Sequence, residues 1–196
     1  SETPPAEQAE AADDPAEAEE SVEEDDEDTA ADGDADDDVP ADDGDDAPDD
    51  GSGDVVEVVA VDFAFEGLPD VIDAGSTLTL RNAAAAELHE LVAFRLPDDE
   101  DRPVEELLDL PPPEMQQILG EPTTVILAPP ASEQIATPIG DGTLTEPGRY
   151  AFLCLIPTGV DPDEYLTAAA TSTGPPDVGD GPPHIVHGMF AEAEVK

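Results

Sequence analysis

From residue 55 onward the chain carries short apolar runs that are broken by Gly and Pro. The runs are rich in Val, Thr, Leu and Phe, and their period of two is that of a β-strand with one buried face. Seven segments fit this pattern, namely residues 55–65, 76–82, 88–96, 123–128, 132–137, 148–155 and 189–195. The pattern therefore predicts an all-β domain over residues 55–196.

Two runs also predict which side chains face the core. In the last run, Glu192 and Glu194 point to solvent while the apolar residues between and around them point inward. In the first run, alternation places five apolar side chains on one face, with Glu57 as the exception: Val55, Val59, Val61, Phe63 and Phe65. Both runs are predicted to be half-buried strands.

Two stretches interrupt the strand pattern and have the character of helices. Residues 103–110 form the first, with a turn that follows as far as Leu119. Residues 161–170 form the second, and they open with Asp161 and Pro162 as a helix N-terminus does. Seven strands in about 140 residues, with helices inserted between them, fit a β-sandwich in which two sheets share one core.

Residues 1–54 have a different composition. They hold 26 Asp and Glu, no Lys or Arg and no aromatic residue. A segment with so much charge and so little to bury is expected to be a disordered tail or linker. Of the net charge of −47, this segment carries −26 and residues 55–196 carry −21, so the predicted domain is itself acidic.

This charge limits the classes of partner. Nucleic acid and anionic lipid headgroups are excluded as expected partners, because both are bound through Lys and Arg, and the chain has only five of these. A basic protein partner remains open. The acidity is also typical of adaptation to a high-salt, halophilic habitat, where salt screens the self-repulsion.

The sequence predicts no transmembrane segment, because it has no run of 18 apolar residues. The chain begins at Ser1 without Met, and a long acidic linker before a compact domain is common in tethered extracytoplasmic proteins. We therefore expect an extracytoplasmic protein, secreted, periplasmic or tethered, with a lipid anchor before Ser1 as one form of the tether.

Few residues in the chain can bind a transition metal. There is one cysteine, Cys154, and the histidines are His89, His184 and His187, with Met189 close behind the last. These types suffice for a trigonal copper site of two imidazoles and a thiolate with a weak axial thioether. The alternatives are that Cys154 is a small buried hydrophobe, that His89 is a core histidine and that Met189 only packs the core.

Three sequence motifs resemble the cupredoxins, the Greek-key sandwiches of plastocyanin, azurin and the copper domains of nitrite reductase. Residues 74–82 (AGSTLTLRN) are similar to the family's early strand before the first ligand, and residues 148–154 (GRYAFLC) to the strand that leads to the copper thiolate. Residues 183–189 (PHIVHGM) are similar to the ligand loop of nitrite reductase. The resemblance implies one copper ion, Cu(I) or Cu(II), with His89, Cys154 and His184 as equatorial ligands and Met189 as the axial ligand.

The chain departs from the family pattern in two places. The family joins the Cys and the second His by a short loop, whereas 29 residues separate Cys154 from His184 here. This segment either folds away from the site or covers it as a lid. Glu90 follows the first His, where the family often has Asn. His187 could replace His184 as a ligand, but its spacing to Met189 fits the family loop less well, so we expect it in solvent or near the ligands.

Three functions are open at this point. The first is a single-copper electron carrier that passes the electron to a redox protein partner through an exposed His184 and the apolar residues around it. The second is copper storage or delivery, with weaker and exchangeable metal. The third is a cupredoxin-like interaction domain that binds no metal.

Enzymatic activity is not expected. Copper oxidases and nitrite reductases need a second copper site built from further histidines, and only His187 is left over. The chain also has no Ser, His, Asp arrangement, no Gly-rich phosphate loop and no Cys-x-x-Cys motif.

Overall fold

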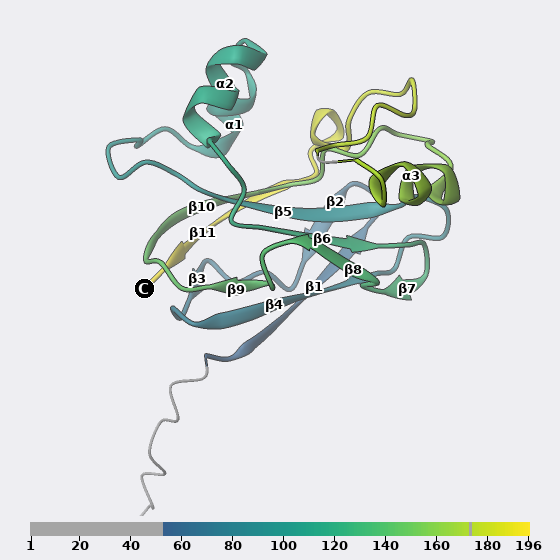
Figure 1. Ribbon diagram of the computed structural model, residues 1–196. Helices are drawn as coiled ribbons and strands as arrows, with labels where there is room; N and C mark the ends of the chain where they lie inside the picture. Colours follow the sequence, from purple (N-terminus) through teal and green to yellow (C-terminus); the bar gives the residue numbers. More distant parts are fainter. Residues whose placement is uncertain (1–52, 173) are drawn as a thin grey trace, which may run out of the picture. The chain divides into compact units, whose positions relative to one another are not determined.

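The computed structural model of the protein describes residues 53–172 and 174–196, and Figure 1 shows that they form a sandwich of two β-sheets. Within these residues one sheet has five strands and the other has six. The predicted all-β sandwich with short helical insertions is thereby confirmed. The predicted acidic tail, residues 1–54, lies outside the described residues except at positions 53 and 54.

The five-stranded sheet is built around β4. Its strands are β2 (Ala64–Glu66), β1 (Val55–Val61), β4 (Ser76–Asn82) and β7 (Ser132–Glu133) in this order, with β9 (Thr143–Leu144) also paired to β4. Strands β1 and β4 run parallel, and the other pairs are antiparallel. Burial alternates along the whole of β4, so every second side chain of this central strand faces the core.

The six-stranded sheet carries the residues of the candidate site. Its strands are β3 (Val71–Ile72), β11 (Phe190–Val195), β10 (Gly148–Leu153), β5 (His89–Arg95), β6 (Thr124–Ala128) and β8 (Ala136–Ile139) in this order. Strands β10 and β5 are antiparallel, with Leu153 opposite Val92, so the end of β10 lies beside the start of β5. This pairing brings the predicted Cys and the first predicted His to one end of the sandwich.

The inner faces of the two sheets enclose the main core. Its fully buried side chains include Leu78 and Leu80 from the five-stranded sheet and Leu91 and Phe152 from the six-stranded sheet. Burying a side chain of this size stabilises the fold by about 1.5–3 kcal/mol. The core therefore holds both sheets together without a disulfide, which the one cysteine of the chain could not form internally.

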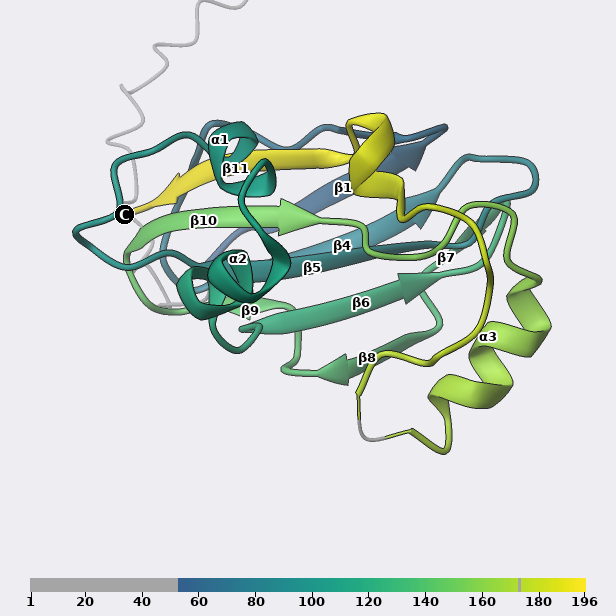
Figure 2. The same cartoon turned by 90° about the horizontal axis from the view of Figure 1, so that it is seen from above.

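Two helices cover the outer face of the six-stranded sheet, as Figure 2 shows. They are α1 (Val104–Leu108), which confirms the predicted helical stretch, and α2 (Pro112–Leu119), a helix that stands where a turn was predicted. Val104 and Leu107 pack with Phe94 and Leu153 in a second hydrophobic cluster. Strand β5 is consequently buried on both faces, which explains the apolar run at residues 91–94 in its centre. None of the helices among the described residues is long and apolar enough to cross a membrane.

The prediction for the first strand was wrong in its buried face. Val58 and Ala60 are fully buried, whereas Val55 is 70% exposed. The run also splits into β1 and β2 at a turn that contains Phe63, whose φ is +60°. Both faces of this run carry Val, Ala or Phe, so its alternation does not select a face, and the parallel pairing with β4 decides it.

Other local predictions are confirmed. In β11, Ala193 and Val195 are buried while Glu192 and Glu194 are exposed. Helix α3 (Pro162–Ala169) lies within the predicted residues 161–170, and the Asp161 carboxylate caps it by accepting a hydrogen bond from Glu164 N at 3.0 Å.

Candidate metal centre

Three of the predicted ligands meet in one buried cluster. His89, Cys154 and His184 are all 0% exposed, and their donor atoms lie within 4.8 Å of one another. The two Nδ1 atoms are 3.1 Å apart, and Cys154 Sγ lies 3.3 Å from Nδ1 of His184 and 3.9 Å from Nδ1 of His89. Three atoms that can coordinate a metal thus lie close together.

This spacing fits a trigonal metal ion. Bonds of about 2.0 Å to nitrogen and about 2.3 Å to sulfur require N···N of about 3.5 Å and N···S of about 3.7 Å in a flat triangle. The observed distances of 3.1, 3.3 and 3.9 Å are close to these values. Two imidazoles and one thiolate are also the donor set that suits copper in both oxidation states.

The three ligands come from three different elements. His89 is the first residue of β5, Cys154 follows directly after β10, and His184 opens η1 (His184–His187), a 3₁₀-helix. Strand pairing sets the first two beside each other. The third is held by backbone hydrogen bonds, because His184 N donates to Ile156 O at 3.0 Å and Ile185 N donates to Cys154 O at 3.1 Å.

Contacts between the two ends of the intervening segment explain how 29 residues can separate Cys154 from His184. Pro157 and Pro183 form a β-bridge, and the amide and hydroxyl of Thr158 both donate to Pro182 O, at 2.9 and 2.8 Å. The two ends of the long segment are therefore fastened together next to the ligands. Helix α3, which lies between these ends (Figure 1), packs on the main core through Tyr165, whose side chain is buried.

The fourth predicted ligand, Met189, lies directly before β11. Its side chain is 0% exposed and belongs to the same core cluster as Cys154. Its carbonyl accepts a hydrogen bond from Cys154 N at 3.2 Å, and its amide donates to His184 O at 3.2 Å. The backbone thus holds Met189 beside two of the three clustered ligands.

The expectation of an exposed His184 was wrong. The side chain is 0% exposed, and Glu87 Oε2 lies 3.4 Å from its Nε2 without hydrogen-bond geometry. The amide of Gly159, near the start of the long segment, donates to the same oxygen of Glu87 at 3.0 Å. The start of this segment is therefore fastened to the residue beside His184.

His187 lies outside the cluster, as expected. Its side chain is exposed, and its ring stacks at a tilt on Phe63, with ring centroids 4.6 Å apart. Phe63 also meets the ring of His184 edge-on, at 5.0 Å between centroids. The sequence predicts a strand through Phe63, so it contained no signal for this contact.

Glu90 supports the cysteine through its backbone and its side chain. Its amide donates to Cys154 Sγ at 3.4 Å, and its carboxylate accepts a hydrogen bond from Leu155 N at 3.1 Å. Glu90, which follows the first histidine ligand, thus links strand β5 to Cys154 and Leu155. Such contacts hold ligands in place.

Burial controls the protonation of the cluster. It raises the pKa of the Cys154 thiol far above its ordinary value, with the nearby Glu90 charge adding to the effect. It lowers the pKa of His89 to about 4, with His184 as the second cause, and it lowers the pKa of His184 as well. The imidazoles are consequently neutral and able to coordinate, and a bound cation would replace the thiol proton.

The two-sheet sandwich and the three converged donors agree with the predicted resemblance to cupredoxins. No model of a known protein family matches the chain, and no curated protein matches it. A search of solved structures does find matches. The chain is similar to auracyanins.

Three of these auracyanins are each 15–18% identical to the chain. The dithionite-reduced auracyanin of Roseiflexus castenholzii is 18% identical with a TM-score of 0.38, and the match covers 74% of this chain and 98% of that protein. Auracyanin B is 15% identical with a TM-score of 0.36, covering 73% and 88%. Auracyanin A, a blue copper protein of Chloroflexus aurantiacus, is 15% identical with a TM-score of 0.33, covering 72% and 98%.

Proposed function

We propose that the protein is a single-copper, type 1 electron-transfer protein. His89, Cys154 and His184 would hold the copper ion in the plane, and Met189 would be the weak axial ligand. A copper ion with these ligands supplies one-electron chemistry between Cu(I) and Cu(II). The observation that carries the proposal is the buried triangle of two Nδ1 atoms and one Sγ.

The chain holds these donors on a rigid frame. His89 and Cys154 lie at the ends of two paired strands, and two backbone hydrogen bonds fasten the His184 segment to residues 154–156. The donor atoms are already near the spacing that an ion needs. Little has to move when the charge of the ion changes, and this favours fast electron transfer.

Two further residues adjust the thiolate. The amide of Glu90 donates to Cys154 Sγ, which favours the charged form of the sulfur that coordinates metal. Met189 lies in the same cluster, and a thioether in the axial position tunes the reduction potential of such a site.

The first test is the visible and EPR spectrum of the full chain after one equivalent of Cu(II) is added. We expect intense visible absorption from thiolate-to-copper charge transfer and a narrow copper hyperfine splitting. A colourless protein with ordinary copper EPR would instead support storage or delivery. No binding at all would support a metal-free interaction domain.

The ligand assignment is tested with a matched pair of histidine variants from the same 3₁₀-helix. His184→Gln should abolish the intense absorption, whereas His187→Gln should keep it, because only His184 belongs to the cluster. Cys154→Ser should abolish it as well, with circular dichroism unchanged. If the Cys154→Ser variant gives the wild-type Cu(II) spectrum, the assignment is wrong.

The location and the partner are part of the same proposal. The acidic linker predicted at residues 1–54 supports an extracytoplasmic protein held near a surface, as predicted above. An electron carrier needs a redox protein partner, and the net charge of −21 over residues 55–196 favours a basic one. Partial proteolysis and fractionation of the native protein would test the first statement.

A further inference from the structure

The burial of the cluster leaves the proposed electron carrier without a direct exit. His89, Cys154 and His184 are all 0% exposed, so no ligand side chain reaches the surface. The Nε2 edge of His184 faces Glu87 rather than solvent. An electron that leaves the site must therefore pass through other groups.

One aromatic contact leads from the cluster to the surface. The Phe63 ring meets His184 edge-on at 5.0 Å and 78°, and its centroid lies 4.6 Å from that of His187. In a 3₁₀-helix, side chains three positions apart lie on the same side, which places both histidines of η1 against one ring. His187 is exposed, so the three rings connect the buried ligand to solvent.

The backbone at Phe63 supports a role for this contact. Its φ of +60° falls in the left-handed region, where a bulky side chain is a genuine outlier. Local strain of this kind persists only where the surrounding structure holds it, and it is common at functional sites. Here the strained turn between β1 and β2 places the Phe63 ring between the two histidines.

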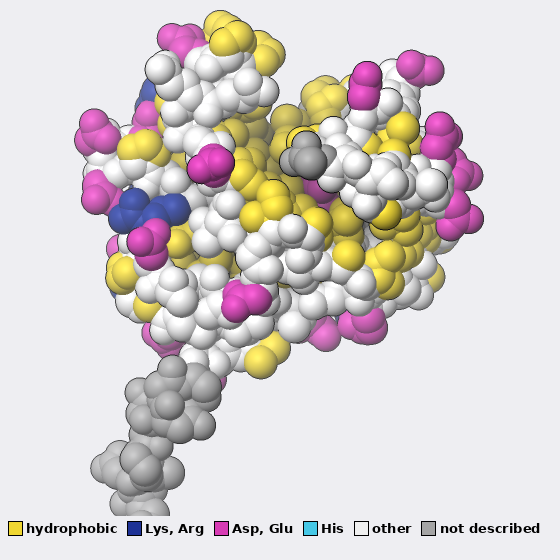
Figure 3. Space-filling model, in the orientation of Figure 1, with side chains coloured by type: hydrophobic (Ala, Val, Ile, Leu, Met, Phe, Trp, Pro, Cys, Tyr) yellow, Lys and Arg dark blue, Asp and Glu magenta, His cyan; other side chains and the backbone are white. Residues whose placement is uncertain are grey.

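A groove lies beside His187, between α1 and η1. It has a volume of about 530 Å³, and its apolar lining includes Ile185 and Phe190, while Val186 is 66% exposed. In Figure 3 the surface is hollowed between the lobe of α1 and α2 and the segment at η1, and hydrophobic side chains gather there. Two exposed carboxylates, Glu105 and Asp109, line the groove, and no Lys or Arg does.

We propose that electrons enter and leave the copper site through Phe63 and His187, and that the groove beside His187 docks a redox protein with Lys or Arg around an apolar contact. This inference rests on the proposed function. In the direction of release, copper loses one electron and becomes Cu(II), and the partner's one-electron acceptor is reduced. No covalent bond forms or breaks, and no proton has to move.

The docking half is tested on the metal-free full chain. The probe is tris(1,10-phenanthroline)chromium(III), a paramagnetic trication with apolar edges that does not exchange electrons with the site. We expect it to broaden the amide NMR signals of Val186, His187 and Gly188 first. Preferential broadening elsewhere on the chain would overturn the docking site, whatever the copper chemistry.

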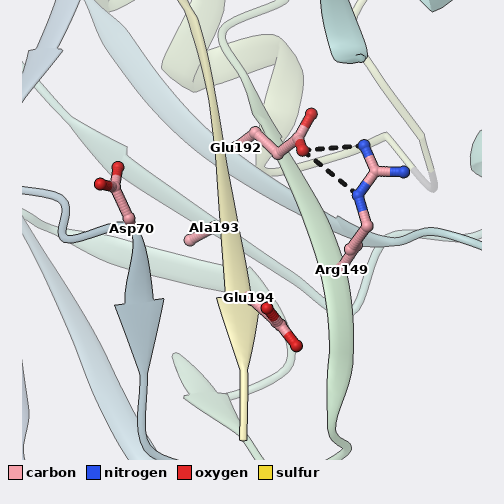
Figure 4. A pocket seen from close by; sticks show the side chains of 5 residues that line it. All are labelled: Asp70, Arg149, Glu192, Ala193 and Glu194. Carbon is pink, nitrogen blue, oxygen red and sulfur yellow. Dashed lines mark hydrogen bonds and ion pairs between the residues drawn. The ribbon is translucent and has the colours of Figure 1, made fainter. Parts of the chain in front are cut away.

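A second acidic groove provides the charge control. Figure 4 shows its lining: Arg149 lies beside Glu192, with which it forms an ion pair at 2.8 Å, and Asp70 lies on the other side of the strand that carries Glu192 and Glu194. Glu105→Gln with Asp109→Asn removes two charges from the docking groove, and Asp70→Asn with Glu194→Gln removes two from the control groove. At about 0.1 M salt, where charges beyond about 10 Å are largely screened, only the first pair should weaken the probe's effect several-fold. Equal effects of both pairs would overturn the docking site.

The relay half is tested on the copper-loaded protein with tris(1,10-phenanthroline)cobalt(III), which takes one electron from Cu(I) and becomes Co(II). Phe63→Leu keeps an apolar side chain but removes the ring, and Phe65→Leu is the matched control in β2. We expect Phe63→Leu and His187→Gln to slow oxidation several-fold, with wild-type visible spectra and reduction potentials, while Phe65→Leu reacts at the wild-type rate. Unchanged rates in the first two variants would overturn the relay alone, whereas absence of the blue spectrum in wild type would overturn the proposed function itself.

Discussion

Glu90→Gln should remove a pH-dependent loss of stability from the metal-free protein. The Glu90 side chain is almost fully buried and accepts one hydrogen bond, from Leu155 N. Burial raises the pKa of this carboxyl from its ordinary 4.5 to about 7, and the hydrogen bond from Leu155 opposes the rise only in part. The folded state therefore prefers the neutral acid.

The sign and size of the effect follow from this difference. The unfolded chain ionises Glu90 near pH 4.5 and the folded chain near pH 7. The stabilising contribution is fully present below pH 4.5 and is lost as the pH rises through 7. A pKa raised from 4.5 to about 7 corresponds to a total loss of about 3 kcal/mol.

The assay is urea unfolding of the metal-free full chain at pH 5 and pH 8. Gln keeps the size of Glu and an oxygen that accepts from Leu155 N, but it carries no charge at either pH. We compare the free energy of unfolding of Glu90→Gln with that of the wild type at each pH. From pH 5 to pH 8, this difference should shift in favour of the variant by about 2.5 kcal/mol. The exposed Glu105→Gln serves as the control and should show no such change.

The comparison of variant with wild type isolates Glu90, because the titrations of His89, His184 and the other carboxyls are common to both proteins. A difference between the two proteins that is the same at pH 5 and pH 8 would refute the reasoning. It would mean that the carboxyl ionises in the folded protein at its ordinary pKa despite its burial.

Three further predictions concern the core, the charge and the axial ligand. Leu80→Ala, at a fully buried position of β4, should cost about 2–5 kcal/mol in urea unfolding, whereas the exposed Val186→Ala should stay within about 0.5 kcal/mol; equal costs would contradict the described core. Raising KCl from about 0.1 to about 1 M, which shortens the screening length from about 10 to about 3 Å, should raise the melting temperature of this acidic protein, and a lower melting temperature would contradict a dominant role of charge repulsion. Met189→Leu should keep the blue colour of the copper-loaded protein but change its reduction potential in voltammetry, and an unchanged potential would argue against an axial thioether.

Local patterns were sufficient to predict most of the elements. Strand β4 has the predicted bounds, and α3 begins one residue after its predicted Asp161 cap, because alternation and capping depend on neighbours along the chain. The doubly buried β5 was also predicted as a strand, from its apolar residues. The break at Phe63 was not predicted, because an apolar residue at a turn looks the same as one in a strand.

The ligand types were visible in the sequence, since Cys154 is the one cysteine and few histidines compete for the metal. The choice of His184 over His187 came from the resemblance to the cupredoxin ligand loop, and the structure places only His184 in the cluster. Glu87 could not have been singled out, because it is one of 52 acidic residues and its position next to His184 depends on the fold.

The sequence by itself determined the strand pattern, the helical insertions and the donor types, because each depends on residues close together in the chain. Only the tertiary structure decided which face of β1 is buried, that the bridge between Pro157 and Pro183 closes the long segment, and that His184 is covered. These features arise from contacts between residues far apart in the chain. Packing and pairing energies select among such contacts, and local periodicity carries no information about the choice.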